Sequence, residues 1–279
     1  MELEKTDSSD EKVNGEAMRE IQNGAKYLSG VRPVEVEAAA PKPEARTLGE
    51  LSLKGLLSNK LLSALPAEDF ARLLSHLEPV SLSSGEELYR LGEATRFAYF
   101  LENAVISQLH LLADGSTTEI AIIGREGMIG LSAIFSSDPP SYLTQVLIAG
   151  SALKIKAEAL KEEFARGGAL QHLLLSYASA RITQISQRAV CNGRHKVEER
   201  FCCWLLTIQD RAGTNSLRLT QEQIARHLGA RRAGVTCVAA ALKDKDVISY
   251  KRGLIRILDR QALEAAACEC YRTFNSLLH

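Results

Sequence analysis

The segment Leu219–Asp259 constrains the fold more than any other part of the chain. Thr220 is followed three residues later by Gln223, and this capping-box pattern predicts that a helix begins at the residue after Thr220. Gly229 follows the last apolar position of that helix, and glycine readily takes the left-handed conformation that ends a helix. A second helix is predicted from Arg232 to about Lys243. The segment therefore predicts two short helices joined by a tight turn.

The predicted second helix has two different faces. One face is apolar, and we expect it to pack on the first helix. It consists of Val235, Val238, Ala239 and Leu242. The other face carries small or polar side chains, namely Ala233, Thr236, Cys237 and Ala240. Arg231 and Arg232 stand at the entrance of this helix, so we expect the second face to be the one that a partner contacts.

A basic hairpin is predicted directly after the second helix. Ile248-Ser249-Tyr250 and Leu254-Ile255-Arg256-Ile257 are typical of two short strands, and Lys251-Arg252-Gly253 of the turn between them. The span from Leu217 to Gly253 holds eight Lys or Arg and three Asp or Glu, a net charge of +5 in a chain whose net charge is zero. Together these features predict a winged helix-turn-helix, which docks a helix in the DNA major groove. The alternative is an ordinary helical hairpin with a solvated basic face.

This docking geometry assigns candidate DNA contacts. We expect the entrance and free face of the second helix to reach base edges, and the hairpin tip to contact phosphates. The candidates are Thr220, Gln221, Arg231, Arg232, Ala233, Thr236, Cys237, Lys251 and Arg252.

Length and composition fit about two globular domains. The chain has 279 residues, of which 46% are hydrophobic, and no segment approaches the ~20 consecutive apolar residues of a membrane helix. The start of the chain lacks the basic and apolar regions of a signal peptide, and six irregularly spaced cysteines do not predict a disulfide framework, so we expect a cytoplasmic protein. No catalytic motif is present, and neither an enzyme nor a cofactor is expected.

The rest of the chain predicts an α+β fold in four regions. Residues 1–48 are polar and poor in large apolar side chains, which is typical of a disordered tail. Residues 49–167 open with short helices and continue as short strands separated by turns, which indicates a β-roll or sandwich. Residues 168–194 form one long helix, and residues 195–279 contain the winged helix-turn-helix.

The long helix, predicted from Ala169 to about Asn192, carries an apolar stripe with alternating spacings of three and four residues. The stripe consists of Leu175, Ala178, Ile182, Ile185 and Ala189. Such a heptad pattern suits two parallel helices packed against each other, and groove-reading helices usually work in pairs on a two-fold site. We therefore predict a homodimer. The alternative is that the stripe packs on its own domain.

A β-roll, a long helix and a winged helix-turn-helix in this order resemble the Crp/Fnr superfamily of bacterial transcription regulators. The resemblance covers about Leu56 to Tyr271. Its motifs are Gly85-Glu86, Gly92-Glu93, Tyr99-Phe100, Arg125-Glu126-Gly127-Met128-Ile129-Gly130, Cys191-Asn192, Val197-Glu198-Glu199-Arg200, Trp204-Leu205-Leu206, Leu219–Ile257 and Glu264–Tyr271. The resemblance implies a cyclic nucleotide-binding-like roll, homodimeric binding to double-stranded DNA, and RNA polymerase as a partner.

The sequence departs from the cyclic-nucleotide receptors of this superfamily at the expected effector pocket. In those receptors the glycine matching Gly130 is followed by a glutamate that holds the ribose hydroxyl, and here Leu131 stands there. In the same receptors an arginine followed by Ser or Thr holds the cyclic phosphate, and here Ser141-Tyr142 stand at these two positions. A buried phosphate needs paired charge or dense hydrogen bonding, so cyclic AMP is not expected to bind. The cysteine cluster of the iron–sulfur members is also absent, because the first cysteine is Cys191.

The recognition helix departs from the family pattern as well. Arg232 matches an arginine that can fork onto guanine, whereas the usual glutamate and second arginine are replaced by Ala233 and Cys237. The target half-site is therefore expected to differ. Nearby arginines can lower a thiol pKa, so we hypothesise that Cys237 is a redox switch, against the alternative of a passive small residue.

The remaining cysteines and the lone histidines are interpreted as structural. Cys202 and Cys203 are expected to be buried core thiols. Cys268-x-Cys270 is too short and isolated for a four-ligand zinc site, so no metal is expected. A haem ligand would have to come from a lone histidine, and the candidates are His76, His110 and His172.

Overall fold

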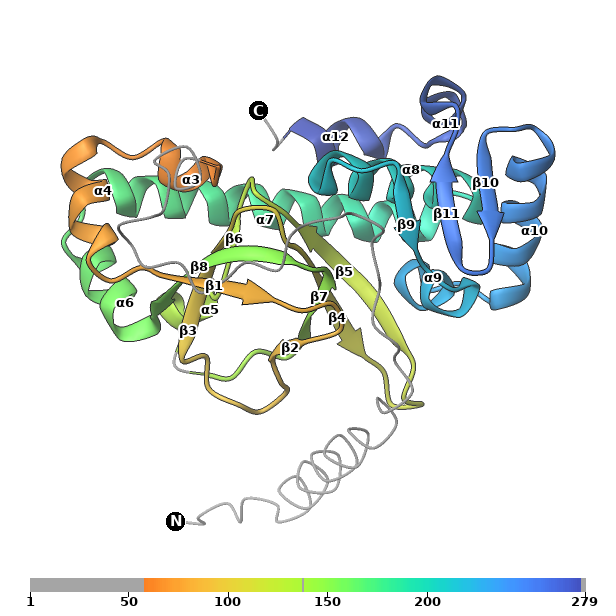
Figure 1. Cartoon of the computed structure of the whole chain (residues 1–279). Helices are drawn as coiled ribbons and strands as arrows, with labels where there is room; N and C mark the ends of the chain where they lie inside the picture. Colours follow the sequence, from red (N-terminus) through yellow and green to blue (C-terminus); the bar gives the residue numbers. More distant parts are fainter. Residues whose placement is uncertain (1–57, 137, 277–279) are drawn as a thin grey trace, which may run out of the picture.

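The computed structural model describes residues 58–136 and 138–276. These residues form a two-sheet β-roll, one long helix and a C-terminal helical unit with a small sheet (Figure 1). The α+β fold class predicted from the sequence is confirmed. The tail predicted for residues 1–48 lies outside the described residues. Within the described ranges, no helix is long and apolar enough to cross a membrane.

Two short helices lead into the roll, α3 (Lys60–Ser63) and α4 (Ala67–Leu74). Asn59 caps α3 by accepting from the backbone N–H of Leu62, and its side-chain amide donates to the carbonyls of Leu101 and Gly127 at 2.7 and 2.8 Å. The side chain of Asn59 is buried, so these bonds satisfy it and fix the entry helix to the roll.

The roll consists of two four-stranded antiparallel sheets with strand orders β1-β8-β3-β6 and β2-β7-β4-β5. Its elements are β1 (Glu78–Leu82), β2 (Glu87–Tyr89), β3 (Phe97–Leu101), β4 (Val105–Leu111), β5 (Thr117–Ile123), β6 (Met128–Ile129), β7 (Leu143–Ile148), β8 (Gly150–Lys156) and the short helix α5 (Ser132–Phe135). Apolar side chains from both sheets, among them Leu101, Ile106, Ile123 and Val146, form the core between them.

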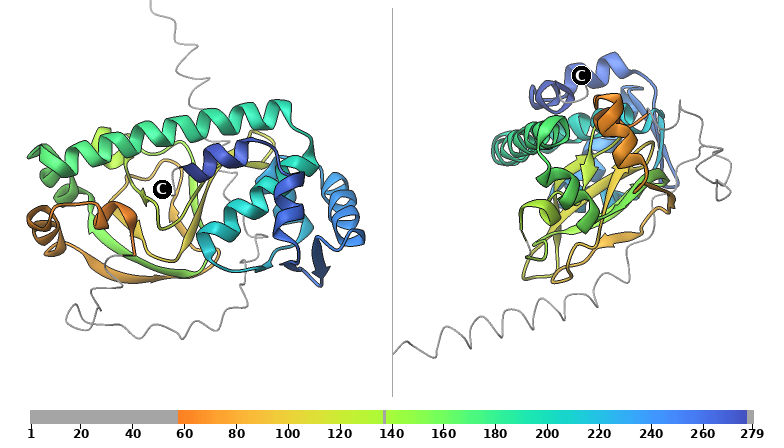
Figure 2. Two further views of the ribbon diagram at one scale, coloured as in Figure 1. Left: turned by 90° about the horizontal axis from the view of Figure 1, so that it is seen from above. Right: turned by 90° about the vertical axis from the view of Figure 1, so that its left-hand side faces the viewer.

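Two helices follow the roll, α6 (Ala157–Ala165) and the 27-residue α7 (Gly168–Arg194). Helix α7 runs along the roll and on to the C-terminal unit, as the view from above in Figure 2 shows. The hydroxyl of Tyr177 donates to the carbonyl of Met128 at 2.9 Å and accepts from its N–H at 3.1 Å. The face of α7 that packs on its own chain consists of Leu170, Leu174, Tyr177, Arg181, Gln184, Arg188 and Cys191.

The C-terminal unit contains a helix-turn-helix and a three-stranded sheet with the order β10-β11-β9. Its elements are α8 (Val197–Ala212), β9 (Ser216–Arg218), α9 (Gln221–Leu228), α10 (Arg232–Asp244), β10 (Ile248–Lys251), β11 (Leu254–Ile257), α11 (Arg260–Ala266) and α12 (Cys270–Ser276). The last helix, α12, returns to pack against α7 and α8.

The local signals of the helix-turn-helix are confirmed. Thr220 Oγ1 accepts from the N–H of Gln223 at 3.2 Å, and Gln223 Oε1 accepts from the N–H of Thr220 at 2.8 Å, which completes the capping box. Gly229 ends α9 with a φ of 56°, and α10 ends at Asp244. Both residues of the hairpin turn, Arg252 and Gly253, have positive φ, as a two-residue turn between right-twisted strands requires.

Candidate DNA-binding interface

The two helices of the helix-turn-helix pack as the sequence predicts. Ile224, Ala225 and Leu228 of α9 are buried against Val235, Ala239 and Leu242 of α10, while Val238 is half-buried. The opposite face of α10 is exposed, and its residues are Ala233, Thr236, Cys237 and Ala240. This division leaves one face of α10 free for a partner.

A groove runs between the start of α9, the start of α10 and the hairpin. It is lined by Thr220, Gln221, Glu222, Arg232, Tyr250, Arg252 and Gly253. The hydroxyl of Thr236 donates to Gln221 Oε1 at 2.7 Å and so links the two helices at the surface. The phenol of Tyr250 donates to the carbonyl of Leu219 at 2.9 Å, which holds the hairpin against the start of α9. The structure thus brings Thr220, Gln221, Arg232 and Arg252 of the predicted contacts to one groove, and their contact with DNA stays a prediction.

The cations of this surface are available to a ligand. Arg231, Arg232, Lys251 and Arg252 are exposed, and within residues 58–136 and 138–276 none of them forms an ion pair. By contrast, Arg226 on α9 lies 3.8 Å from Glu222. Unpaired guanidinium and ammonium groups around a groove favour a polyanion, because they can neutralise phosphates without first losing an internal partner.

The expected effector residues flank α5. Gly130 has a φ of 97°, and a Cβ atom there would lie 2.7 Å from the hydroxyl of Tyr89. That hydroxyl donates to the carbonyl of Phe97 at 2.8 Å, and burial raises the pKa of Tyr89 well above its usual range. Leu131 is half-buried and packs on an apolar cluster that includes Met128 and Ile134. A neutral phenol and a leucine therefore stand beside the glycine.

The other expected effector and haem residues lie near the surface. Ser141 is exposed and Tyr142 is half-buried, in the segment between α5 and β7. His76, His110 and His172 are all exposed, which does not suit a haem ligand that must be screened from solvent.

A buried carboxylate joins the roll to the helix-turn-helix. Glu119 on β5 has no exposed side-chain surface. Its carboxylate accepts from the Ser107 hydroxyl at 2.7 Å and from Trp204 Nε1 at 2.9 Å, and lies 3.0 Å from His227 Nδ1. The indole of Trp204 stacks on the imidazole of His227 with ring centroids 5.3 Å apart. Arg188 of α7 lies 3.8 Å from the same carboxylate. One side chain of the roll thus contacts α7, α8 and α9.

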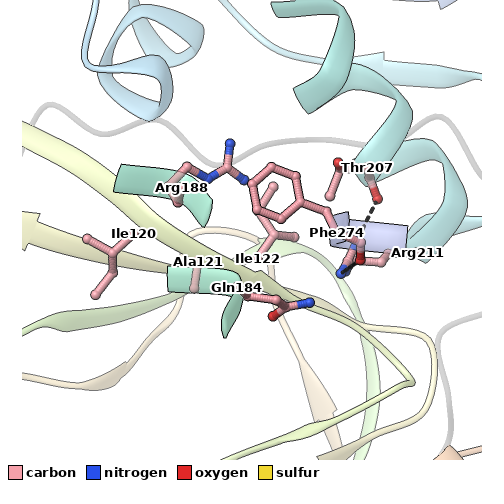
Figure 3. A pocket seen from close by; sticks show the side chains of 8 residues that line it. All are labelled: Ile120, Ala121, Ile122, Gln184, Arg188, Thr207, Arg211 and Phe274. Carbon is pink, nitrogen blue, oxygen red and sulfur yellow. Dashed lines mark hydrogen bonds between the residues drawn. The ribbon is translucent and has the colours of Figure 1, made fainter. Parts of the chain in front are cut away.

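A second contact lies beside the first. The carboxylate of Glu126, in the turn before β6, accepts from Arg211 of α8 at 2.6 Å, and both side chains are buried. Figure 3 shows the neighbouring cavity, in which Arg188 lies over the ring of Phe274 at 4.5 Å. Its volume is about 10 Å³, room for at most one water molecule. It is lined by Ile120, Ala121, Ile122, Gln184, Arg188, Thr207, Arg211 and Phe274. The junction is therefore tightly packed.

The turn of the helix-turn-helix also touches the roll. A Cβ atom at Gly229 would lie 3.1 Å from the side chain of Thr118 on β5. Gly229 therefore serves both the left-handed turn and the close approach of the two units. The sequence predicts the first role but not the second, because Thr118 is distant in the chain.

The cysteines divide into an exposed one and a buried group. Cys202 and Cys203 are buried as predicted, and burial raises the pKa of Cys202 to about 12. Cys237 is exposed on α10, and its redox role stays a prediction. The prediction that Cys268-x-Cys270 is isolated is wrong. The fold brings Cys191 and His195 beside this pair, although Cys191 and Cys268 are 77 residues apart in the sequence.

Three of these thiols interact directly. Hydrogen bonds from Cys191 and Cys203 hold the pKa of the Cys268 thiol below its ordinary value. The same contacts, together with burial, raise the pKa of Cys191 and Cys203. Sequence reasoning missed this group, although Cys191 and His195 are four residues apart at a helix end and thus on one face. It also missed Glu119, the one charged residue of β5.

Two protein-family models match the chain, one over the roll and one over the helix-turn-helix. A Crp-like helix-turn-helix domain matches residues 199–266, and a cyclic nucleotide-binding domain matches residues 79–166. No curated protein matches the chain.

Solved structures share the whole two-part fold. A protein of the Crp/Fnr family from Eubacterium rectale has a TM-score of 0.60 at 19% identity, over 74% of this chain and 97% of its own. FixK2 from Bradyrhizobium japonicum has a TM-score of 0.59 at 19% identity, over 69% and 98%. The c-di-GMP-responsive regulator CLP from Xanthomonas campestris has a TM-score of 0.57 at 15% identity, over 69% and 99%.

The roll and the helix-turn-helix define a DNA-binding regulator with a cyclic nucleotide-binding-like domain. The chain belongs to the Crp/Fnr superfamily of transcription regulators, as the sequence resemblance predicts.

Proposed function

We propose that the protein is a cytoplasmic, sequence-specific DNA-binding regulator that acts as a homodimer and does not respond to cyclic AMP. The observation that carries this proposal is the set of unpaired cations around the groove between α9, α10 and the hairpin. In this proposal residues 49–167 are the sensor domain, residues 168–194 the dimerisation helix, and residues 195–279 the DNA-binding domain. RNA polymerase is the proposed protein partner, and no catalytic role is assigned.

The exposed face of α7 supports the homodimer. The predicted stripe does not coincide with the face that packs on the roll. Leu175, Ile182 and Ile185 are 48%, 67% and 40% exposed, which is unusual for large apolar side chains on a long helix. Ala178 lies between Leu175 and Ile182, Ala189 follows Ile185 by one turn, and both permit close approach of a second helix. A copy of α7 would cover this stripe, which the chain's own roll leaves exposed.

We expect Arg232→Ala to weaken DNA binding and to relax base preference at one position of each half-site. The side chain stands at the entrance of α10 on the groove, where a guanidinium can form two hydrogen bonds with guanine. The expected loss is about 1–3 kcal/mol. Selection of bound sites from random DNA, followed by anisotropy titrations on the selected site, measures both effects.

The matched control is the double variant Lys251→Ala/Arg252→Ala on the hairpin. We expect it to weaken all DNA sequences similarly and to reduce the salt dependence of binding, because hairpin cations neutralise phosphates. A changed base preference in this control would contradict the docking geometry. If the wild-type protein selects no sequence at all, the alternative function is favoured, that of a regulator with a degenerate DNA-binding head that acts by protein contact.

We expect no binding of cyclic AMP at micromolar concentration. Leu131 and Tyr89 stand beside Gly130 and offer no charge to a ribose or a phosphate, and Ser141 is exposed. A phosphate that leaves water without a paired charge loses more hydration than neutral groups return. Isothermal calorimetry with cyclic AMP should show no saturable heat, and cyclic GMP and c-di-GMP serve as comparison ligands. A micromolar dissociation constant for cyclic AMP would refute this part of the proposal.

A further inference from the structure

A cluster of metal-binding side chains lies where α7 meets the C-terminal segment. The cysteine–histidine cluster consists of Cys191, His195, Cys268 and Cys270. Cys191 lies in the last turn of α7 and His195 directly follows this helix, whereas Cys270 is the first residue of α12. One ligand atom from each side chain lies within 4.8 Å of all the others. The cluster thus draws four donors from two distant segments to one point.

Two of the distances in the cluster are close to those around a tetrahedral ion. Zinc lies about 2.3 Å from thiolate sulfur and about 2.0–2.1 Å from imidazole nitrogen, which predicts about 3.8 Å between two sulfurs and about 3.6 Å between sulfur and nitrogen. The Sγ atoms of Cys191 and Cys268 lie 3.6 Å apart. The Sγ atom of Cys270 lies 3.5 Å from Nδ1 of His195. Both separations agree with the tetrahedral values to within about 0.2 Å.

Polar neighbours orient the ligands. The other imidazole nitrogen of His195, Nε2, lies 3.2 Å from the carboxylate of Glu269. This contact keeps Nδ1 turned towards Cys270. The side-chain amide of Gln187 donates to the sulfur of Cys270 at 3.0 Å. Metal-bound histidines usually donate their second N–H to a carboxylate, and bound thiolates usually accept such hydrogen bonds. The contact of His195 with Glu269 is therefore of the kind that accompanies a metal-bound histidine.

Burial argues for a cation among the thiols. All three cysteines of the cluster are buried, and the His195 side chain is 15% exposed, which leaves a route for an ion to enter. A cation bound among them would stabilise the thiolate form of all three cysteines. Binding of Zn²⁺ to three thiols and a neutral imidazole releases three protons and leaves one net negative charge at the site.

We propose that the cysteine–histidine cluster binds one Zn²⁺ ion. A closed set of four ligands with three cysteines and one histidine is typical of structural zinc. The ion would tie Cys268 and Cys270 to the end of α7, and α12 packs against both α7 and α8. It thereby fixes the helix that leads into the DNA-binding unit. Cys203 is buried beside Cys191, Cys268 and Cys270 but is not one of the four ligands.

Metal analysis of the full-length protein tests the proposal. Protein purified with added zinc and then dialysed should contain about one zinc per chain. Cys270→Ser and His195→Ala should each lose most of it, whereas His195→Cys should retain it, because four cysteines also hold zinc. Cys237→Ser is the matched control, since this exposed cysteine lies on α10 and should not change the zinc content. Circular dichroism confirms that each variant is folded.

A spectroscopic measurement distinguishes a built site from adventitious binding. X-ray absorption should show three sulfur ligands at about 2.3 Å and one nitrogen at about 2.0–2.1 Å. Chelation should lower the melting temperature of the wild type by several degrees and leave folded Cys270→Ser unchanged, because only a bound ion stabilises the native state. If the wild-type protein held no zinc after zinc loading and dialysis, the proposal would be overturned. A Cys191–Cys268 disulfide, or an iron–sulfur chromophore in place of zinc, would also overturn it.

Discussion

Replacing Ile182 with aspartate is expected to convert the proposed dimer into a monomer. Ile182 is the most exposed large apolar side chain of the α7 stripe, at 67%. In a symmetric pair of α7 helices, the two aspartates would face each other in an apolar seam with no counter-charge. The expected cost is about 3–5 kcal/mol, which weakens association at least a hundredfold. Analytical ultracentrifugation should then show a species near the chain mass of 30.5 kDa.

Thr183→Asp is the matched control for this substitution. Thr183 is exposed and adjacent to Ile182, but the helical rotation of about 100° per residue turns it away from the stripe. This variant should remain dimeric. Ile182→Asp should also lose affinity for a two-fold DNA site, because each monomer can occupy only one half-site. A dimer of unchanged affinity in Ile182→Asp would remove α7 as the dimerisation helix.

The sequence predicts those features whose causes lie within a few residues. The capping box of Thr220 and Gln223 and the turn at Gly229 are of this kind, and the structure has both where they were predicted. The face division of α10 follows from the helical period, and the free stripe of α7 from the heptad. These features account for the helix-turn-helix and for most of the candidate DNA contacts.

Contacts between distant segments could not be predicted in the same way. Trp204 and His227 lie 85 and 108 residues from Glu119, and no local pattern pairs them. The cysteine–histidine cluster likewise depends on the return of α12 to the end of α7. Its two halves, each too short for a metal site, become one set of ligands only after the chain folds.

The buried carboxylate of Glu119 connects the roll to the helix-turn-helix. It lies on β5 of the roll, yet its hydrogen-bond partners Trp204 and His227 belong to α8 and α9. A change in the position of β5 would therefore act directly on the first helix of the DNA-binding motif. Helix α9 in turn shares one core with α10, so a continuous set of packed residues joins β5 to the second helix of the motif.

Replacing Glu119 with alanine is expected to lower the free energy of unfolding by about 3–5 kcal/mol. The substitution leaves the indole N–H of Trp204, the imidazole of His227 and the nearby guanidinium of Arg188 buried without their common acceptor. Urea unfolding followed by far-ultraviolet circular dichroism measures the loss. Trp204 is the single tryptophan of the chain, so its fluorescence reports on this junction and should shift as water enters.

Two further variants separate the junction from a general effect of charge removal. Glu78→Ala removes an exposed carboxylate that pairs with Lys154 at 2.9 Å on the surface of the roll, and stability should hardly change because water screens this pair. Glu119→Gln keeps the shape of the side chain and one acceptor oxygen, so its urea midpoint should lie between those of Glu119→Ala and the wild type. If Glu119→Ala kept the wild-type urea midpoint and tryptophan emission, the roll and the helix-turn-helix would not be joined through this carboxylate in solution.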